Sequence, residues 1–167
     1  GVGDEIPFLS CLVEICDGIT RPVVIEVDER LVHLVGRSFP KAAVVPRQLV
    51  PGDGRGQYLD YRALTERYGL RHHVLSGSLP YILNRDRDRP LERRGYLQTD
   101  PQRVAHWRGW LAGLGEGAKV GVVWRTVQWT RFRARFHCTI EELFPVFSTP
   151  SCIFVSLMAG DTEQERA

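Results

Sequence analysis

The first residues able to do chemistry stand at the start of the sequence, where Gly1 to Asp4 (GVGD) lead into an apolar helical pattern. A glycine-rich turn at a helix N-terminus presents backbone N–H groups, which suit an anionic substrate group. Gly1 and Gly3 are therefore candidate substrate-binding residues. Asp4 has two interpretations: it acts on a substrate in a cleft, or it caps the helix that begins at Glu5.

A second group of candidates lies near the ends of two later apolar runs. Arg125 directly follows the run KVGVVW, and α/β sheets place ligands at the carboxyl ends of their strands. Its guanidinium could neutralise a diphosphate, and Arg131 in the following loop could assist. The alternative is that these arginines are flexible side chains of a solvated loop and bind no ligand. Gly77 and Ser78 could present backbone N–H groups to an acceptor, or they form only a turn.

Strands and helices must position these candidates, and the apolar pattern predicts both. Strands are expected over 22–27, 42–45, 119–124 and 152–157, with a further short one at 73–75. Helices are expected over 6–17, 29–38, 59–68 and 100–114, and a capping box formed by Thr139 and Glu142 begins one that reaches 147. Asp28 is the expected N-cap of the helix over 29–38, and Gly69 is expected to end the helix over 59–68. Trp107 and Trp110 lie three residues apart on one face of their helix and are expected in the core. The ranges 46–57 and 84–94 have the composition of loops. Because strands alternate with helices, the sequence predicts an α/β fold with a Rossmann-like parallel sheet.

The pattern also suggests where the chain divides. A glycine turn of this kind normally follows a β-strand, and none stands before it, so we expect residues 1–116 to form an α/β domain without its first strand. The strand–helix–strand pattern restarts after the glycines at 115–117, so residues 117–167 are expected to begin a second domain. An incomplete sheet leaves backbone groups unpaired at an edge. Self-association through that edge is one way to pair them.

Composition narrows the classes of function. The 167-residue chain is 43% hydrophobic and 25% charged, with a formal net charge of +2. It is therefore expected to fold, and its charge alone does not indicate a polyanionic partner. The four cysteines lack metal-ligand spacing, so we expect reduced thiols, no bound metal and no cofactor. With neither a signal-peptide pattern nor a membrane-spanning apolar run, the sequence predicts a cytoplasmic protein with no membrane partner.

Six motifs occur in a fixed order along nearly the whole chain: GVGDEIPFLSCL, VVIEVDERLVHLVGRSFP, GSLPYIL, GYLQTDPQRVAHWRGWLAGLG, KVGVVWR and FVSLMAGD. Together they resemble the glycosyltransferase region found after tetratricopeptide repeats in bacterial proteins. That region is similar to heptosyltransferases and more distantly to O-linked N-acetylglucosamine transferases.

The resemblance implies two facing Rossmann-like domains of the GT-B type, the first for the acceptor and the second for the nucleotide-sugar donor. Residues 1–116 would be most of the first domain, and 117–167 the start of the second. The parent protein would transfer a sugar from a nucleotide-sugar to a hydroxyl acceptor, with Asp4 as the base that matches the family's glycine-aspartate motif. The isolated chain is expected to be inactive. One departure is that no glycine follows Trp124 and Arg125, where relatives usually have a glycine-containing loop.

Two alternatives belong to other classes of function. The chain could be a non-catalytic α/β interaction or binding module, because most of the donor domain is absent. A weaker alternative is single-stranded nucleic-acid binding through residues 124–137, which interleave arginines with aromatic side chains. The rest of the chain is not basic, and no nucleic-acid motif accompanies this segment.

Overall fold

The computed structural model describes residues 2–18, 20–51, 57–83, 95–126, 132, 135 and 137–159. The chain divides into two compact units, Gly1–Asp100 and Pro101–Ala167. The predicted domain boundary at 116/117 stays a prediction. Within the described residues, no helix combines the length and apolar character needed to cross a bilayer.

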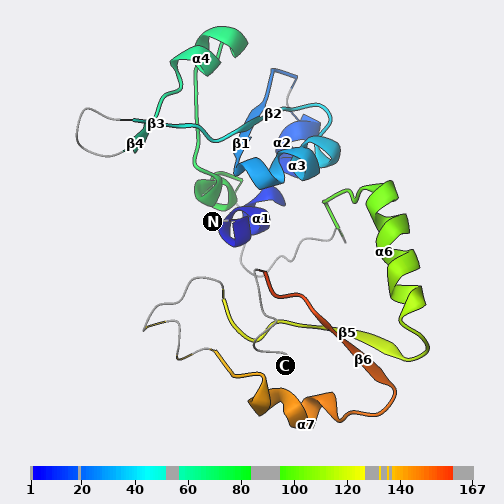
Figure 1. Ribbon diagram of the computed structural model, residues 1–167. Coiled ribbons are helices and arrows are strands. Elements are labelled where there is room, and N and C mark those ends of the chain that lie inside the picture. The colour runs from blue at the N-terminus through cyan, green and yellow to red at the C-terminus, as the bar shows by residue number, and fades with distance from the viewer. Residues whose placement is uncertain are drawn as a thin grey trace. The chain divides into compact units, whose positions relative to one another are not determined.

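The first unit is built around a parallel pair of strands, β1 (Val24–Val27) and β2 (Ala43–Pro46) (Figure 1). A 3₁₀ turn (Glu29–Leu31) and helix α3 (Val32–Ser38) connect them. The Asp28 side chain caps this turn by accepting a hydrogen bond from the Arg30 backbone N–H, at 3.1 Å. This β–helix–β unit confirms the predicted strands and their parallel direction to within two residues at each end.

One face of β1 supplies the centre of the core. Ile25 and Val27 lie two residues apart, so their side chains point to the same face of the strand. They are only 6% and 2% exposed. The buried side chains packed with them come from the helices before and after β1 and from one later helix: Leu9, Cys11, Leu12, Cys16, Leu31, Val35, Phe39 and Leu79. All four cysteines in the chain are free thiols, as expected.

The predicted helix over 6–17 is in fact two helices, α1 (Val2–Leu9) and α2 (Leu12–Gly18). The break lies at Ser10, whose Oγ donates to the Pro7 carbonyl at 2.8 Å. A serine side chain that bonds back to the preceding turn competes with the helical ladder. The apolar spacing continues through the break, which is why periodicity alone does not reveal it.

The segment expected to be a loop over 46–57 contains a strand. β3 (Leu49–Pro51) pairs antiparallel with β4 (Gln57–Leu59). Helix α4 (Arg62–Tyr68) follows and ends at Gly69, whose φ of 61° gives the expected left-handed C-cap. Residues 71–75 form no strand, so the prediction at 73–75 was wrong. A 3₁₀ turn (Ser76–Ser78) and α5 (Leu79–Ile82) follow, and residues 84–94 lie outside the described part.

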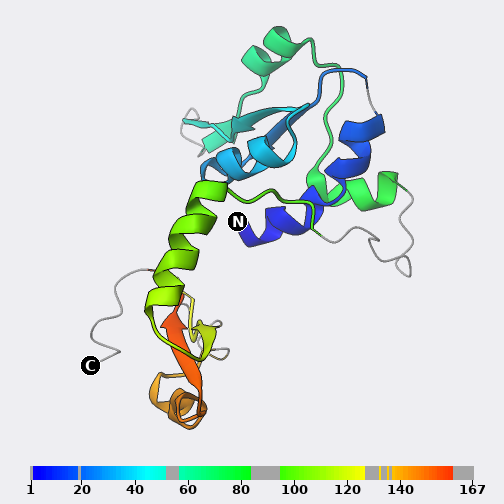
Figure 2. The same cartoon turned by 90° about the vertical axis from the view of Figure 1, so that its right-hand side faces the viewer.

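The second unit contains another parallel pair. Helix α6 (Pro101–Gly113) leads to β5 (Ala118–Val122), which runs side by side with β6 (Cys152–Ser156) (Figure 2). A 3₁₀ turn (Glu141–Leu143) and α7 (Phe144–Phe147) precede β6. The predicted capping box is confirmed: the Thr139 N–H donates to Glu142 Oε2 at 2.7 Å, and the Glu142 N–H donates to Thr139 Oγ1 at 3.4 Å. The chain is thus a mixed α/β fold with small parallel sheets.

Trp107 and Trp110 were expected in the core, because they lie three residues apart on one helix. They are instead 49% and 44% exposed on α6, where their rings meet edge to face at 5.6 Å. A spacing of three residues places two side chains on the same face of a helix, but it does not show whether another element packs against that face.

We expect Gly117→Ala to destabilise the second unit. Gly117 has a φ of 121°, and an added Cβ would lie 2.8 Å from the carbonyl oxygen of Ser151, a backbone atom that cannot rotate away. The same carbonyl accepts the Ala118 N–H that begins the β5–β6 ladder. Backbone strain of this kind costs on the order of 1–3 kcal/mol, measurable by urea denaturation. Gly109→Ala in the open interior of α6 is the control and should not destabilise; equal losses would contradict the prediction.

Candidate functional site

Charged side chains gather where the parallel strands of the first unit end. Asp28 directly follows β1, and Arg47 directly follows β2. Because both strands run in the same direction, these two residues lie at the same end of the sheet, where the strands have their carboxyl ends. We call this end the charged edge. This is the edge at which α/β proteins place ligands.

Glu5 of α1 joins both strand ends. One carboxylate oxygen accepts the backbone N–H of Asp28 at 2.9 Å, and the other accepts from Arg47 Nη2, also at 2.9 Å. The Glu5 side chain is only 13% exposed, whereas that of Arg47 is 37% exposed. A carboxylate buried to this degree needs partners for both oxygens, and the two strand ends provide them. Glu5 therefore holds the first turn of α1 at the carboxyl ends of β1 and β2.

Asp28 carries a second interaction at this edge. Its carboxylate receives two hydrogen bonds from the Arg30 guanidinium, at 2.8 and 2.9 Å, in the bidentate arrangement that guanidinium groups favour. Hydrogen bonds from the Arg30 side chain, and then from its backbone N–H, hold the pKa of Asp28 well below its ordinary value. Asp28 is therefore anionic across the physiological range.

A phenol lies beside the same strand. The Tyr61 hydroxyl donates to Glu26 Oε2 at 3.0 Å, and its ring stacks on His73 with centroids 6.4 Å apart. Burial, and then the hydrogen bond to Glu26, raise the pKa of Tyr61 above its ordinary value. Tyr61 therefore acts as a neutral donor at pH 7. With the nearby carboxylates and guanidinium groups, this edge offers both acceptors and donors to a hydroxyl-rich or anionic ligand.

The predicted substrate-binding residues at the start of the chain lie close to this edge. Asp4 and Gly3 are exposed in the first turn of α1. Asp4 lies inside the helix, not at the residue before it, so the capping interpretation does not describe its position. Gly1 lies outside the described residues.

The turn that contains Gly77 and Ser78 packs against α1. A Cβ on Gly77 would lie 3.8 Å from the ring of Phe8. Phe8 is four residues after Asp4, so the two side chains share one face of the helix. The structure therefore brings two of the predicted substrate-binding segments together, on the Phe8 side of α1.

Arg125 belongs to the second unit. It follows Trp124, which is 5% exposed and whose carbonyl accepts the Cys138 N–H at 3.2 Å. Two residues on, the Thr126 N–H donates to His137 Nε2 at 3.3 Å. These contacts hold the half-buried Arg125 at the carboxyl end of β5, as expected. Arg131 lies outside the described residues.

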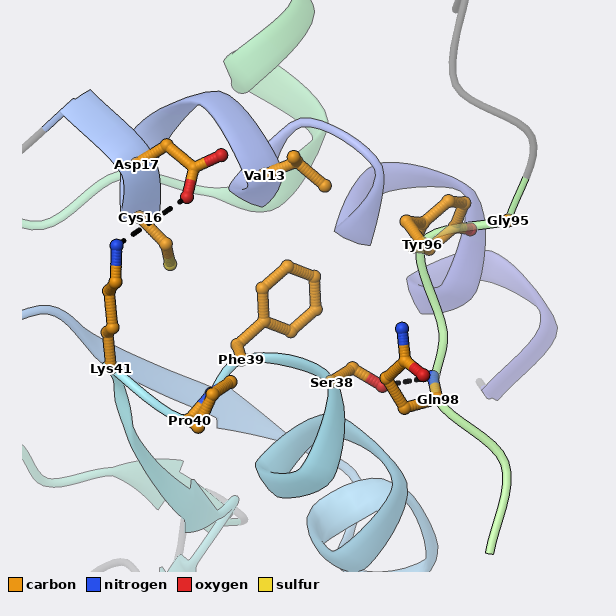
Figure 3. Close-up of a pocket in the computed structure, with 10 residues that line it drawn as sticks. All are labelled: Val13, Cys16, Asp17, Ser38, Phe39, Pro40, Lys41, Gly95, Tyr96 and Gln98. Carbon is orange, nitrogen blue, oxygen red and sulfur yellow. Dashed lines mark hydrogen bonds and ion pairs between the residues drawn. The ribbon is translucent and has the colours of Figure 1, made fainter. Parts of the chain in front are cut away.

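A pocket of about 270 Å³ lies elsewhere in the first unit, between α2, the residues after α3 and the segment that begins at Gly95 (Figure 3). Phe39 projects toward its centre, and Lys41 pairs with Asp17 at its rim, at 3.8 Å. Burial, and then the charge of Asp17, raise the pKa of the Cys16 thiol. Since 38–41 lead into β2, this pocket is at the amino end of the strands, opposite the charged edge.

Sequence reasoning missed Glu5 and Arg47 and considered Asp28 only as a cap. Their position in the sequence could have identified two of these residues, because Asp28 and Arg47 are charged residues that directly follow apolar runs. Nothing in the sequence distinguishes Glu5 from its exposed neighbour Asp4. Only the fold shows which of the two carboxylates turns inward.

Comparison with known proteins gives one informative similarity. Protein FlbA from Caulobacter vibrioides is 33% identical over 170 residues. The alignment covers all of this chain but 28% of FlbA. No protein-family model matches the chain, and no solved structure matches it.

We expect Glu5→Ala to destabilise the first unit by about 1–3 kcal/mol, because it leaves a strand-end N–H and a guanidinium without their acceptor. Glu5→Gln should lose less, since an amide oxygen still accepts from Asp28. Glu66→Ala, at an exposed position of α4, is the control and should stay within about 0.5 kcal/mol of the wild type. Chemical denaturation measures all three, and similar losses for Glu5→Ala and Glu66→Ala would contradict the bridging role.

Proposed function

We propose that this chain is part of a GT-B-type glycosyltransferase similar to those that follow tetratricopeptide repeats in bacterial proteins. The parent protein transfers a sugar from a nucleotide-sugar to a hydroxyl acceptor in the cytoplasm. The first unit contributes to the acceptor side, with Asp4 as the base. The second unit begins the donor side, with Arg125 as a contact for the leaving diphosphate.

One observation carries this proposal: the second, fifth and sixth motifs fall, in that order, in two successive parallel β–helix–β units. β1 and β2 arise from the second motif and the residues after it, while β5 and β6 arise from the last two motifs. A GT-B-type protein requires two such α/β halves in this order. The charged edge of the first unit also suits a hydroxyl-rich acceptor, because it combines carboxylate acceptors with guanidinium and phenol donors.

The second candidate is a non-catalytic binding module. It is favoured by the residues around Arg125, because the loop after Trp124 lacks the glycine that lets a backbone approach a phosphate closely. The chain also spans only 28% of the length of FlbA, so any activity of a whole relative depends on much more than this region.

We expect the 167-residue chain to show no turnover of nucleotide-sugars, because little of a donor domain is present. The parent activity is tested in FlbA with this chain substituted for the matching region. Purified FlbA and the chimaera should release nucleoside diphosphate from a nucleotide-sugar, detected by chromatography, and Asp4→Ala in the chimaera should abolish transfer. Glu66→Ala is the control for folding and should leave the rate unchanged. If whole FlbA is inactive with every nucleotide-sugar tested, the binding-module alternative replaces the enzyme.

We expect the chain itself to bind nucleotide-sugars weakly, with a dissociation constant of about 1 mM or above, since a single guanidinium offers few contacts. Saturation-transfer NMR should show the signal reduced by Arg125→Ala. Arg108→Ala, on the exposed surface of α6, should leave it unchanged. An equal effect of both changes would contradict the phosphate role of Arg125. Binding of single-stranded RNA with a steep salt dependence would instead support the nucleic-acid alternative.

A further inference from the structure

The hydrogen bonds between β1 and β2 show which backbone groups face away from the pair. The Ala43 N–H donates to the Val23 carbonyl at 2.9 Å, and the Arg47 N–H donates to the Val27 carbonyl at 2.8 Å. In a parallel ladder, alternate residues of a strand bond to the same neighbour. Val23, Ile25 and Val27 therefore face β2, whereas the N–H and C=O groups of Val24 and Glu26 point to the opposite side.

The outer edge of β2 has the character of a true sheet edge. The residues of β2 that face outward are Val44 and Pro46, because their neighbours bond to β1. Proline has no N–H, and in sheets it is confined to edge strands and similar positions. The side chains of β2 are also only partly buried. A further strand would therefore find an incomplete set of donors on this side.

The outer edge of β1 differs in both respects. Val24, Glu26 and Asp28 all have an N–H on this side. In the part of the chain that the structure describes, no backbone bond from another strand reaches Val24 or Glu26. β1 also carries deeply buried side chains, at Ile25 and Val27, which are 6% and 2% exposed. Deep burial, a full donor set and pairing on one side only are the properties of an interior strand with an open position beside it.

The position of Glu5 gives the direction of the strand that would fill this place. The Asp28 N–H, the third donor on the outer edge, donates to Glu5 of α1. The first turn of α1 therefore lies at the carboxyl end of the open position. A strand that runs parallel to β1 would end beneath this turn and could lead directly into α1.

We propose that the outer edge of β1 binds an extended, β-branched strand parallel to it, and that this strand is joined directly to the start of α1. Its backbone bonds to the N–H and C=O groups of Val24 and Glu26, while the Glu5–Asp28 hydrogen bond marks its carboxyl end. Val, Ile and Thr side chains suit it because one of its faces continues the core formed by Ile25 and Val27. This inference does not depend on glycosyl transfer.

The test is amide hydrogen exchange of the chain with and without an added strand. One variant carries a segment of five valine, isoleucine and threonine residues, followed by glycine, ahead of Gly1. A matched variant has proline at alternate positions of the segment. We expect only the first to slow exchange at Val24 and Glu26, by about 10-fold or more. Ile25 and Val27, whose amides already bond to β2, serve as internal references, and the protein should stay monomeric in light scattering.

Two further variants fix the binding edge. In the strand-extended protein, Val24→Pro removes a donor from the outer edge of β1 and should abolish the protection of Glu26. Val44→Pro removes a donor from the outer edge of β2 and should not. If the unextended chain does not fold, recovery of a dispersed NMR spectrum with the β-branched segment but not with its proline counterpart supports the proposal.

Three results would overturn the proposal. The first is unchanged amide exchange at Val24 and Glu26 in the strand-extended protein, and the second is equal slowing by the β-branched segment and its proline counterpart. The third is an unextended chain that is unfolded and that neither segment causes to fold. Protection in the unextended chain that rises with protein concentration would also overturn it, because the strand would then come from a second copy.

Discussion

The carboxylate of Glu5 connects the parts of the first unit, because it links α1 to the ends of both parallel strands. Its two oxygens are bonded to a backbone N–H and to a guanidinium, so α1 cannot rotate about its axis without breaking one of them. The rotation of α1 in turn decides which residues reach the core: Leu9 is buried, while Asp4 remains at the surface. The candidate base and the core thus depend on the same interaction.

The sequence predicted most of what local rules control. Apolar runs located β1, β2, β5 and β6, and hydrogen-bonding side chains located the cap at Asp28 and the capping box at Thr139 and Glu142. These predictions succeeded because the residues that indicate each strand or cap lie within a few positions of it in the sequence. The break at Ser10 was missed because the bond to Pro7 competes with a helix that the apolar spacing otherwise supports.

Features that depend on distant partners were predicted less well. Glu5 and Arg47 are 42 residues apart, and Tyr61 and Glu26 are 35 apart, so no local pattern links them. The β3–β4 hairpin was hidden by the glycines and prolines around it, which are as frequent in loops as in hairpin connections. The exposed tryptophans of α6 were mispredicted for a related reason. The sequence shows that they share one face of the helix, but it does not show whether another element covers that face.

The segment after residue 94 has a consequence for how the first unit forms. The Tyr96 hydroxyl donates to the Ile6 carbonyl at 2.6 Å, and the Gln98 N–H donates to Ser38 Oγ at 2.9 Å. These contacts span 90 and 60 residues of sequence. During synthesis, α1 therefore lacks its Tyr96 contact, and α3 its Gln98 contact, until the chain has passed these residues. The unit closes late, and contacts of such separation slow folding. Its buried thiols at Cys11 and Cys16 would stay accessible to a labelling reagent on a nascent chain and become protected on completion.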